Sequence, residues 1–146
     1  MTVARICEAD LAAPLLRWLE SSGRINDNTL VVRELPWYGR RVDIATLNAS
    51  KMTSAFELKL RDNRRAIEQA ARNTLTFDRS YVVTATSPTE RSRGLAAQLG
   101  VGLLVVDLDT GGVMTIQHPN VGSPPIRVRQ RLRSRIRARS GDSDDV

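Results

Sequence analysis

The sequence predicts an α/β domain with a mixed β-sheet and helices on both faces. Short apolar segments of strand length alternate with amphipathic segments of helical length along residues 8–117. Residues 54–84 and 80–107 each have the pattern strand, helix, strand, which is typical of a parallel crossover. The expected order of elements is α-β-β-β-α-β-α-β-β.

The first half of the chain predicts a helix followed by a three-stranded meander. The helix is expected at 8–22, with Asp10 as its cap, one apolar stripe and Gly23 at its end. A turn at 36–39 separates the first two strands, and a polar segment precedes the third. The strands are expected at 30–35, 41–47 and 54–60.

The second half predicts two helices between strands. Asp62 is a suitable cap for a helix at 63–77, which places apolar residues on one side and arginines on the other. The segment 102–107 is almost wholly apolar, so we expect a strand that is buried on both faces. The remaining elements are a strand at 80–84, a helix at 89–99 and a strand at 113–117.

Charge divides the chain into two parts. Residues 1–125 carry 15 basic and 13 acidic side chains and are expected to form the core domain. Residues 126–146 carry seven arginines and three aspartates and form a basic extension, whose end at 140–146 we expect to be disordered. Arginine at every second position would suit a strand. The spacing of Val128, Leu132 and Ile136 would suit a helix, so both conformations remain open.

Composition excludes several classes of protein. No apolar run approaches the ~20 residues of a membrane span, and the first residues do not have the pattern of a secretory signal. A single cysteine, Cys7, rules out an internal disulfide and suits a reducing cytoplasm. The net charge of +6, concentrated in the extension, favours a polyanionic partner, either nucleic acid or an anionic surface.

Three charged residues in the second and third strands form the candidate site. Glu57 and Lys59 are two positions apart, so both side chains leave the same face of their strand. Asp43 can lie opposite Glu57 if the two strands pair as a hairpin. Carboxylates are ligands for Mg²⁺ or Mn²⁺, and the backbone carbonyl of Leu58 is a further candidate ligand. Lys59 could then stabilise negative charge on a reacting phosphate.

These residues resemble the motif of the PD-(D/E)XK nuclease superfamily, which includes restriction endonucleases and Holliday-junction resolvases. The similarity comprises Arg41-Val42-Asp43, then Phe56-Glu57-Leu58-Lys59, and the element order over about residues 5–117. It implies a restriction-endonuclease-like fold in which Asp43 and Glu57 bind the metal and Lys59 is catalytic. It also implies a catalytic role for Gln69 on the next helix, and Glu8 matches an acidic residue that some members use.

The resemblance implies a Mg²⁺-dependent nuclease that acts in repair, recombination or defence; DNA is favoured over RNA as its substrate, and RNA remains an alternative. A homodimer or a targeting protein partner is expected, because such small cores rarely enclose a duplex alone. The alternatives are an ordinary ion pair between Glu57 and Lys59, and a non-catalytic nucleic-acid-binding or scaffold module. The residues expected to contact nucleic acid are Arg64, Arg65, Arg127, Arg129, Arg131, Arg133, Arg135 and Arg137.

Overall fold

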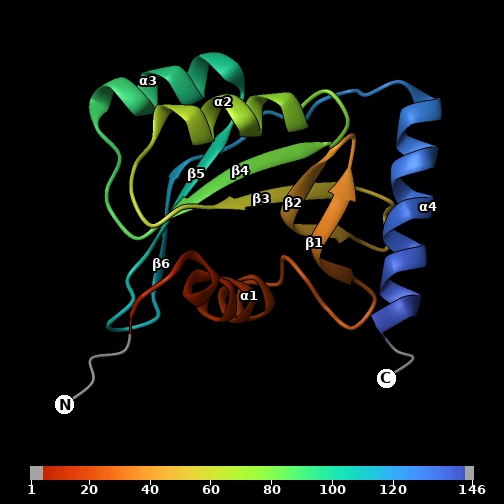
Figure 1. Ribbon diagram of the computed structural model, residues 1–146, viewed down its shortest axis with the longest axis horizontal. Coiled ribbons are helices and arrows are strands. Elements are labelled where there is room, and N and C mark those ends of the chain that lie inside the picture. The colour runs from red at the N-terminus through yellow and green to blue at the C-terminus, as the bar shows by residue number, and fades with distance from the viewer. Residues whose placement is uncertain (1–4, 144–146) are drawn as a thin grey trace.

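A six-stranded mixed sheet forms the centre of the protein in a computed structural model that describes residues 5–143 (Figure 1). The strands lie in the order β1-β2-β3-β4-β5-β6; the β3–β4 and β4–β5 pairs are parallel and the other three antiparallel. The predicted α/β class is therefore confirmed. The strands are β1 Leu30–Trp37, β2 Arg40–Leu47, β3 Thr53–Leu58, β4 Arg79–Thr84, β5 Gly102–Val106 and β6 Val113–Gln117.

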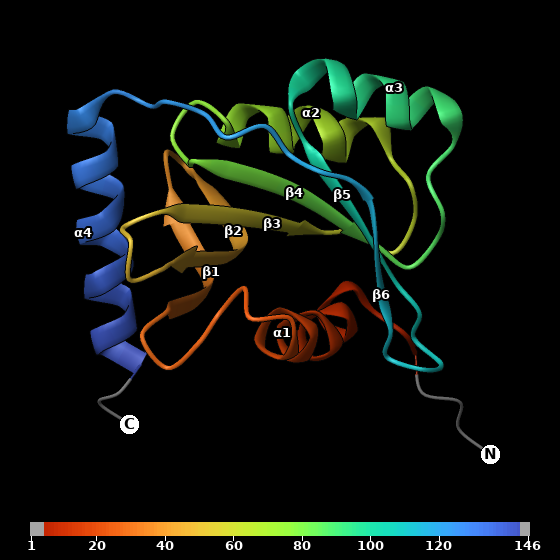
Figure 2. The same cartoon turned by 180° about the vertical axis from the view of Figure 1, so that it is seen from behind.

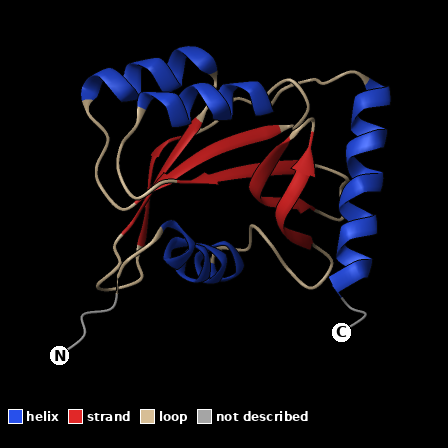
Figure 3. Ribbon diagram, in the orientation of Figure 1, coloured by secondary structure: helices blue, strands red, loops and turns tan. Residues whose placement is uncertain are grey.

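Helices cover both faces of the sheet, as Figure 3 shows. The 3₁₀ turn η1 and helix α1 pack on one face, where Leu11 and Leu15 meet Ile44 and Phe56. Helices α2 and α3 pack on the other face over β4 and β5, and α4 covers β1 and β2. The helical elements are η1 Glu8–Leu11, α1 Ala12–Ser21, α2 Arg64–Asn73, α3 Glu90–Leu99 and α4 Ile126–Ser143.

Helix ends differ from the expectation where a neighbouring residue provides the better cap. Asn63, not Asp62, caps α2, and its side chain accepts hydrogen bonds from the backbone N–H groups of Arg65 and Ala66. Asp62 instead accepts from the Thr89 N–H and the Ser92 hydroxyl at the start of α3. The first helix begins with the 3₁₀ turn, in which Asp10 accepts from the Cys7 N–H at 2.8 Å.

The β1–β2 hairpin is longer than its sequence indicated. The turn is confined to Tyr38 and Gly39, which both have positive φ, whereas Pro36 and Trp37 still pair with β2. Trp37 stays in the strand because its ring is buried and its indole N–H donates to the Thr76 hydroxyl at 3.0 Å.

The arginine-rich segment forms helix α4, which resolves the choice between strand and helix. Leu132 and Ile136 are fully buried against the sheet, and Val128 packs beside them, so the apolar stripe decides the conformation. Figures 1 and 2 show α4 alongside the β1–β2 end of the sheet from both sides. Residues 140–143 continue the helix rather than being disordered, and 144–146 lie outside the described residues.

We predict that Ile136→Ala lowers the free energy of unfolding by about 2–5 kcal/mol, because it leaves a cavity between α4 and the sheet. Chemical denaturation with a fluorescence readout measures the change. Arg137→Ala, on the exposed side of the same turn, is the matched control and should stay within about 0.5 kcal/mol of the parent. Equal effects of the two substitutions would contradict the packing of α4 on the sheet.

Candidate functional site

The carboxyl groups of Asp43 and Glu57 meet where the pairing of β2 with β3 ends. The last paired residues are Ile44 and Phe56, so the same register sets Asp43 opposite Glu57. The Leu58 N–H donates to the Asp43 carboxylate at 2.8 Å, in place of a backbone carbonyl of β2. The two acidic side chains interact directly with each other, as the expected hairpin geometry required.

Helix α2 holds the Glu57 carboxyl group through Asn73. The residue is only 5% exposed, and the Asn73 side-chain amide donates to its Oε1 at 2.9 Å. Arg40 in turn donates to the side-chain oxygen Oδ1 of Asn73 at 2.9 Å. Arg40, Asn73 and Glu57 therefore form a chain of contacts from the β1–β2 hairpin to the carboxylate pair.

Burial and the neighbouring carboxylate raise the pKa of Glu57 from 4.5 to about 7. Desolvation is the largest cause, and the charge of Asp43 and its hydrogen bond act in the same direction. The Asn73 hydrogen bond and the charge of Arg40 oppose this rise. Near neutral pH the Asp43–Glu57 pair is thus partly protonated, and a bound cation could replace that proton.

Asp43 opens onto a surface cavity of about 550 Å³ between η1 and the β1–β2 hairpin. Glu8, Glu34 and Arg33 also line this cavity, together with Leu58 and Leu60. Glu34 has a φ of 54°, which is unusual for a residue other than glycine, and it lies where β1 runs past Asp43. Asp43 is therefore the member of the pair that solvent reaches, and Glu57 lies behind it.

Lys59 is near this cavity but does not pair with Asp43 or Glu57. Its Nζ lies 3.8 Å from Oε1 of Glu8, in an ion pair whose side chains are 32% and 50% exposed. The sequence placed Lys59 beside Glu57, but the regular strand ends at Leu58. The structure thus brings together two pairs, Asp43 with Glu57 and Lys59 with Glu8.

Helix α2 presents Asn73, not Gln69, to the carboxylate of Glu57. The Gln69 side chain is half-buried and makes no hydrogen bond or ion pair with Asp43 or Glu57, while its backbone carbonyl lies 3.5 Å from Arg40. Sequence reasoning missed Asn73 and Arg40. The signal available for Asn73 was its position: it is a polar residue that continues the buried stripe of Ala66 and Ala70.

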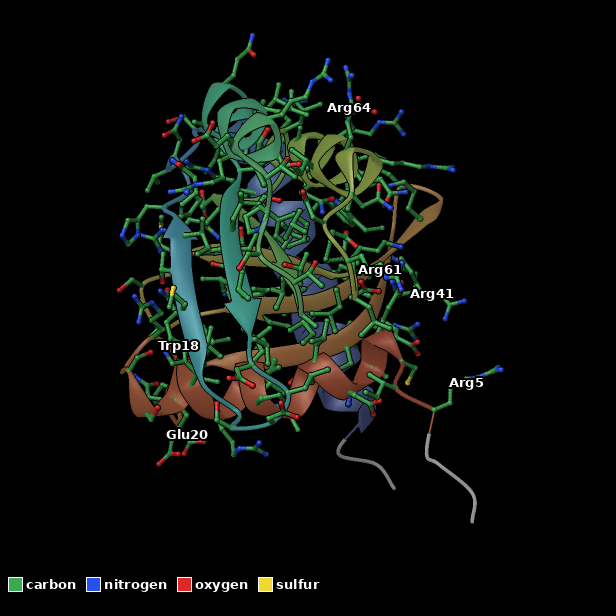
Figure 4. The ribbon with its side chains drawn as sticks, turned by 90° about the vertical axis from the view of Figure 1, so that its left-hand side faces the viewer. Arg5, Trp18, Glu20, Arg41, Arg61 and Arg64 are labelled. Atoms are coloured by element: carbon green, nitrogen blue, oxygen red, sulfur yellow. The ribbon has the colours of Figure 1, made fainter. Side chains whose placement is uncertain are left out.

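The arginines expected to contact nucleic acid occupy two separate regions. Arg64 and Arg65 are exposed at the start of α2, where Arg64 pairs with Glu68 at 3.0 Å. In Figure 4, Arg64 lies at the end of the molecule opposite α1, while Arg41, Arg61 and Arg5 lie along one flank.

On α4, Arg127 and Arg137 are exposed, whereas Arg129 is 29% exposed and lies 3.4 Å from the buried carboxylate of Asp78. Three more α4 arginines donate to the body of the protein. Their partners are the Tyr38 hydroxyl for Arg131, the Lys51 carbonyl for Arg133 and the Pro36 carbonyl for Arg135.

Among the side chains that the structure describes, those of residues 5–141, no group of three or more His, Cys, Asp or Glu could hold a metal ion. A cation at this position would therefore need two carboxylates and backbone or water oxygens. Over the same residues, no helix is long and apolar enough to cross a membrane.

We predict that wild-type protein loses stability relative to Glu57→Gln as pH rises from about 4.5 to about 8. The raised pKa means that the folded state retains a proton that the unfolded state has released. Stabilisation from that proton is complete below pH 4.5 and is lost as pH passes through about 7, a change on the order of 3 kcal/mol. Denaturation across this range measures the difference, and a constant gap between the two proteins would contradict it.

We also predict that Asn73→Ala costs about 1–3 kcal/mol of stability and raises the pKa of Glu57 further, because its buried Oε1 loses a donor. Denaturation at several pH values reports both effects. Asn63→Ala, which removes only the cap of the same helix, controls for damage to α2 and should leave the pH dependence unchanged. An identical pH profile for Asn73→Ala and wild type would refute the coupling.

No family model matches the sequence, and no curated protein matches it. Among solved structures, a protein of unknown function from Silicibacter pomeroyi has a TM-score of 0.65 at 16% identity, over 97% of this chain and 90% of its own.

Two further structures match 70% of this chain but only about half of their own length. One is a repair endonuclease from Pyrococcus abyssi, with a TM-score of 0.49, 21% identity and 48% of its chain covered. The other is the EndoMS–dsDNA2 complex, with a TM-score of 0.48, 17% identity and 47% of its chain covered. What is established is the fold, a mixed sheet flanked by helices, which this chain shares with the Silicibacter protein over nearly its whole length.

Proposed function

We propose that this protein is a metal-dependent nuclease that hydrolyses DNA phosphodiester bonds. The observation that carries the proposal is the contact between Asp43 and Glu57 at the end of the β2–β3 pairing, beside a cavity open to solvent. Two adjoining carboxylates repel each other unless a proton or a cation lies with them. The resemblance of these residues to the PD-(D/E)XK motif supports the same assignment.

The residues present fit a hard divalent cation such as Mg²⁺ or Mn²⁺. Asp43 and Glu57 would provide carboxylate oxygens, and Leu58 would provide its backbone carbonyl. The Leu58 N–H faces Asp43, and both backbone groups of a strand residue leave on the same side, which favours that carbonyl. When bound, such an ion activates water and neutralises charge on a phosphate.

Lys59 and Glu8 would act from the other side of the cavity. Lys59 would stabilise the charge that develops on the phosphate, once that phosphate competes with Glu8 for the ammonium group. Glu8 would then be free to bind the metal or a metal-bound water. Asn73 and Arg40 would hold Glu57 in place, a positioning role that we assign to them in preference to Gln69.

Arginines on the surrounding surface would bind the phosphate backbone. Arg64 and Arg65 are exposed at the start of α2, and Arg127 and Arg137 are exposed on α4. We exclude Arg129 from this set, because it is engaged with the buried Asp78. Such contacts give affinity and orientation without selecting a sequence, so a second copy of the chain or a targeting partner would complete the recognition.

A non-catalytic module with the same fold is the second candidate. It is favoured by the burial of Glu57 behind Asn73 and by the pairing of Lys59 with Glu8, since both arrangements satisfy the charges without a substrate. Neutralising the carboxylates separates the two candidates, because only the nuclease would lose an activity.

We predict that Asp43→Asn and Glu57→Gln each reduce DNA cleavage by at least about 100-fold, because both carboxylates would hold the cation. The assay uses single-stranded, linear, flapped and branched DNA with Mg²⁺ or Mn²⁺. Glu20→Gln, an exposed carboxylate that Figure 4 shows on the far side from Arg41, is the matched control and should retain full activity. Absence of cutting on every substrate, with DNA binding intact, would establish the non-catalytic module instead.

Calorimetry provides a readout that does not depend on activity. Binding of Mg²⁺ or Mn²⁺ should release a proton and should be tighter at about pH 8 than at about pH 5.5, because the pKa of Glu57 is about 7 before the ion binds. Glu57→Gln should remove the proton release. Metal binding that is independent of pH and of Glu57 would overturn the assignment of the site.

A further inference from the structure

A second cavity lies near the start of β3, on the face of the sheet that α1 covers. Its volume is about 320 Å³, and it lies between β2, β3, β4, the segment after α1 and the segment after β6. Ser54 lines it near the start of β3, whereas Glu57 lies near the end of that strand. The two cavities have no lining residue in common.

Positive charge without an acidic partner distinguishes this second cavity. Its polar lining includes Arg24, Arg79, His118 and Tyr81, and no acidic residue is among the described residues that line it. Neither arginine forms an ion pair with any of the side chains described, which are those of residues 5–141. Burial raises the pKa of Tyr81, and the charges of Arg79 and Arg24 oppose that rise.

Aromatic packing holds these groups in place. The Tyr81 ring stacks on Phe56 with centroids 4.8 Å apart, and the Arg24 guanidinium lies 4.3 Å from the centre of the Trp18 ring. Gly102 provides room for Tyr81, since a Cβ at that position would lie 2.6 Å from the tyrosine ring. Tyr81 and Arg24 are therefore positioned by contacts with aromatic rings, which leaves their hydroxyl and N–H groups for a ligand.

We propose that this cavity binds a phosphate monoester. Two arginines, a histidine and a tyrosine line a space with no competing carboxylate among its described lining, and arginine forks match the geometry of phosphate oxygens. The volume is at the lower end of the range for ligand pockets, which suits a small organic phosphate. The ligand is either a free mononucleotide-sized phosphate or the terminal phosphate of a nucleic-acid strand, and the site does not depend on the proposed nuclease activity.

His118 is the only histidine in the chain, so its imidazole NMR signals report on this cavity without assignment of other residues. The full-length protein is titrated at constant ionic strength with inorganic phosphate, dAMP, acetate, and a short oligonucleotide with and without a 5′-phosphate. We expect a saturable shift of the His118 signals with phosphate and dAMP and none with acetate. Preference for dAMP identifies a free ligand, and preference for the 5′-phosphorylated strand over its unphosphorylated form identifies a strand end.

Arg24→Gln and Arg79→Gln should each weaken phosphate binding by about tenfold or more, because each removes a charge-assisted donor. Arg93→Gln removes the same charge from the exposed side of α3 and should leave binding unchanged. Thermal unfolding of each variant shows that it is folded. Non-saturable shifts, acetate binding as tight as phosphate, or an equal loss in Arg93→Gln would overturn the proposal.

Discussion

The contact between the Asp43 and Glu57 carboxyl groups is the constraint on which the candidate site depends. Negative charge on both of these adjoining carboxylates would raise the free energy of the folded state, and burial of Glu57 adds to that cost. The surrounding structure compensates with directed donors: the Leu58 N–H for Asp43, and the Asn73 amide, backed by Arg40, for Glu57. A pair that is costly to keep, yet reached by solvent through Asp43, is typical of a site that binds a cation or a proton.

Helix α4 shows how a strongly basic segment becomes part of a packed domain. Leu132 and Ile136 fill the space over β1 and β2, and the arginines between them extend to the edges of the contact. Arg129 meets Asp78, whose other carboxylate oxygen accepts from the Thr53 N–H at the start of β3. Part of the arginine excess thus stabilises the fold, and only the exposed remainder is available to a polyanion.

The two ends of β3 carry opposite electrostatic character. Asp43 and Glu57 meet near its last residue, whereas Arg24 and Arg79 lie around the cavity near its first residues, which has no acidic residue in its described lining. The ring of Phe56, stacked on Tyr81, lines this second cavity. Because the two cavities share no lining residue, each region can bind its own ligand.

The sequence by itself determined the α/β class, the element order up to β6 and the pairing that sets Asp43 opposite Glu57. These features arise from local periodicity and from a register that apolar residues impose on both strands. Tertiary structure alone decided the partner of Lys59 and the conformation of the arginine-rich segment. It also decided that Asn73, and not Gln69, is the residue of α2 that contacts Glu57. Each of these depends on where a helix lies relative to the sheet, and a shift of one helical turn along α2 exchanges Gln69 for Asn73 without altering the pattern.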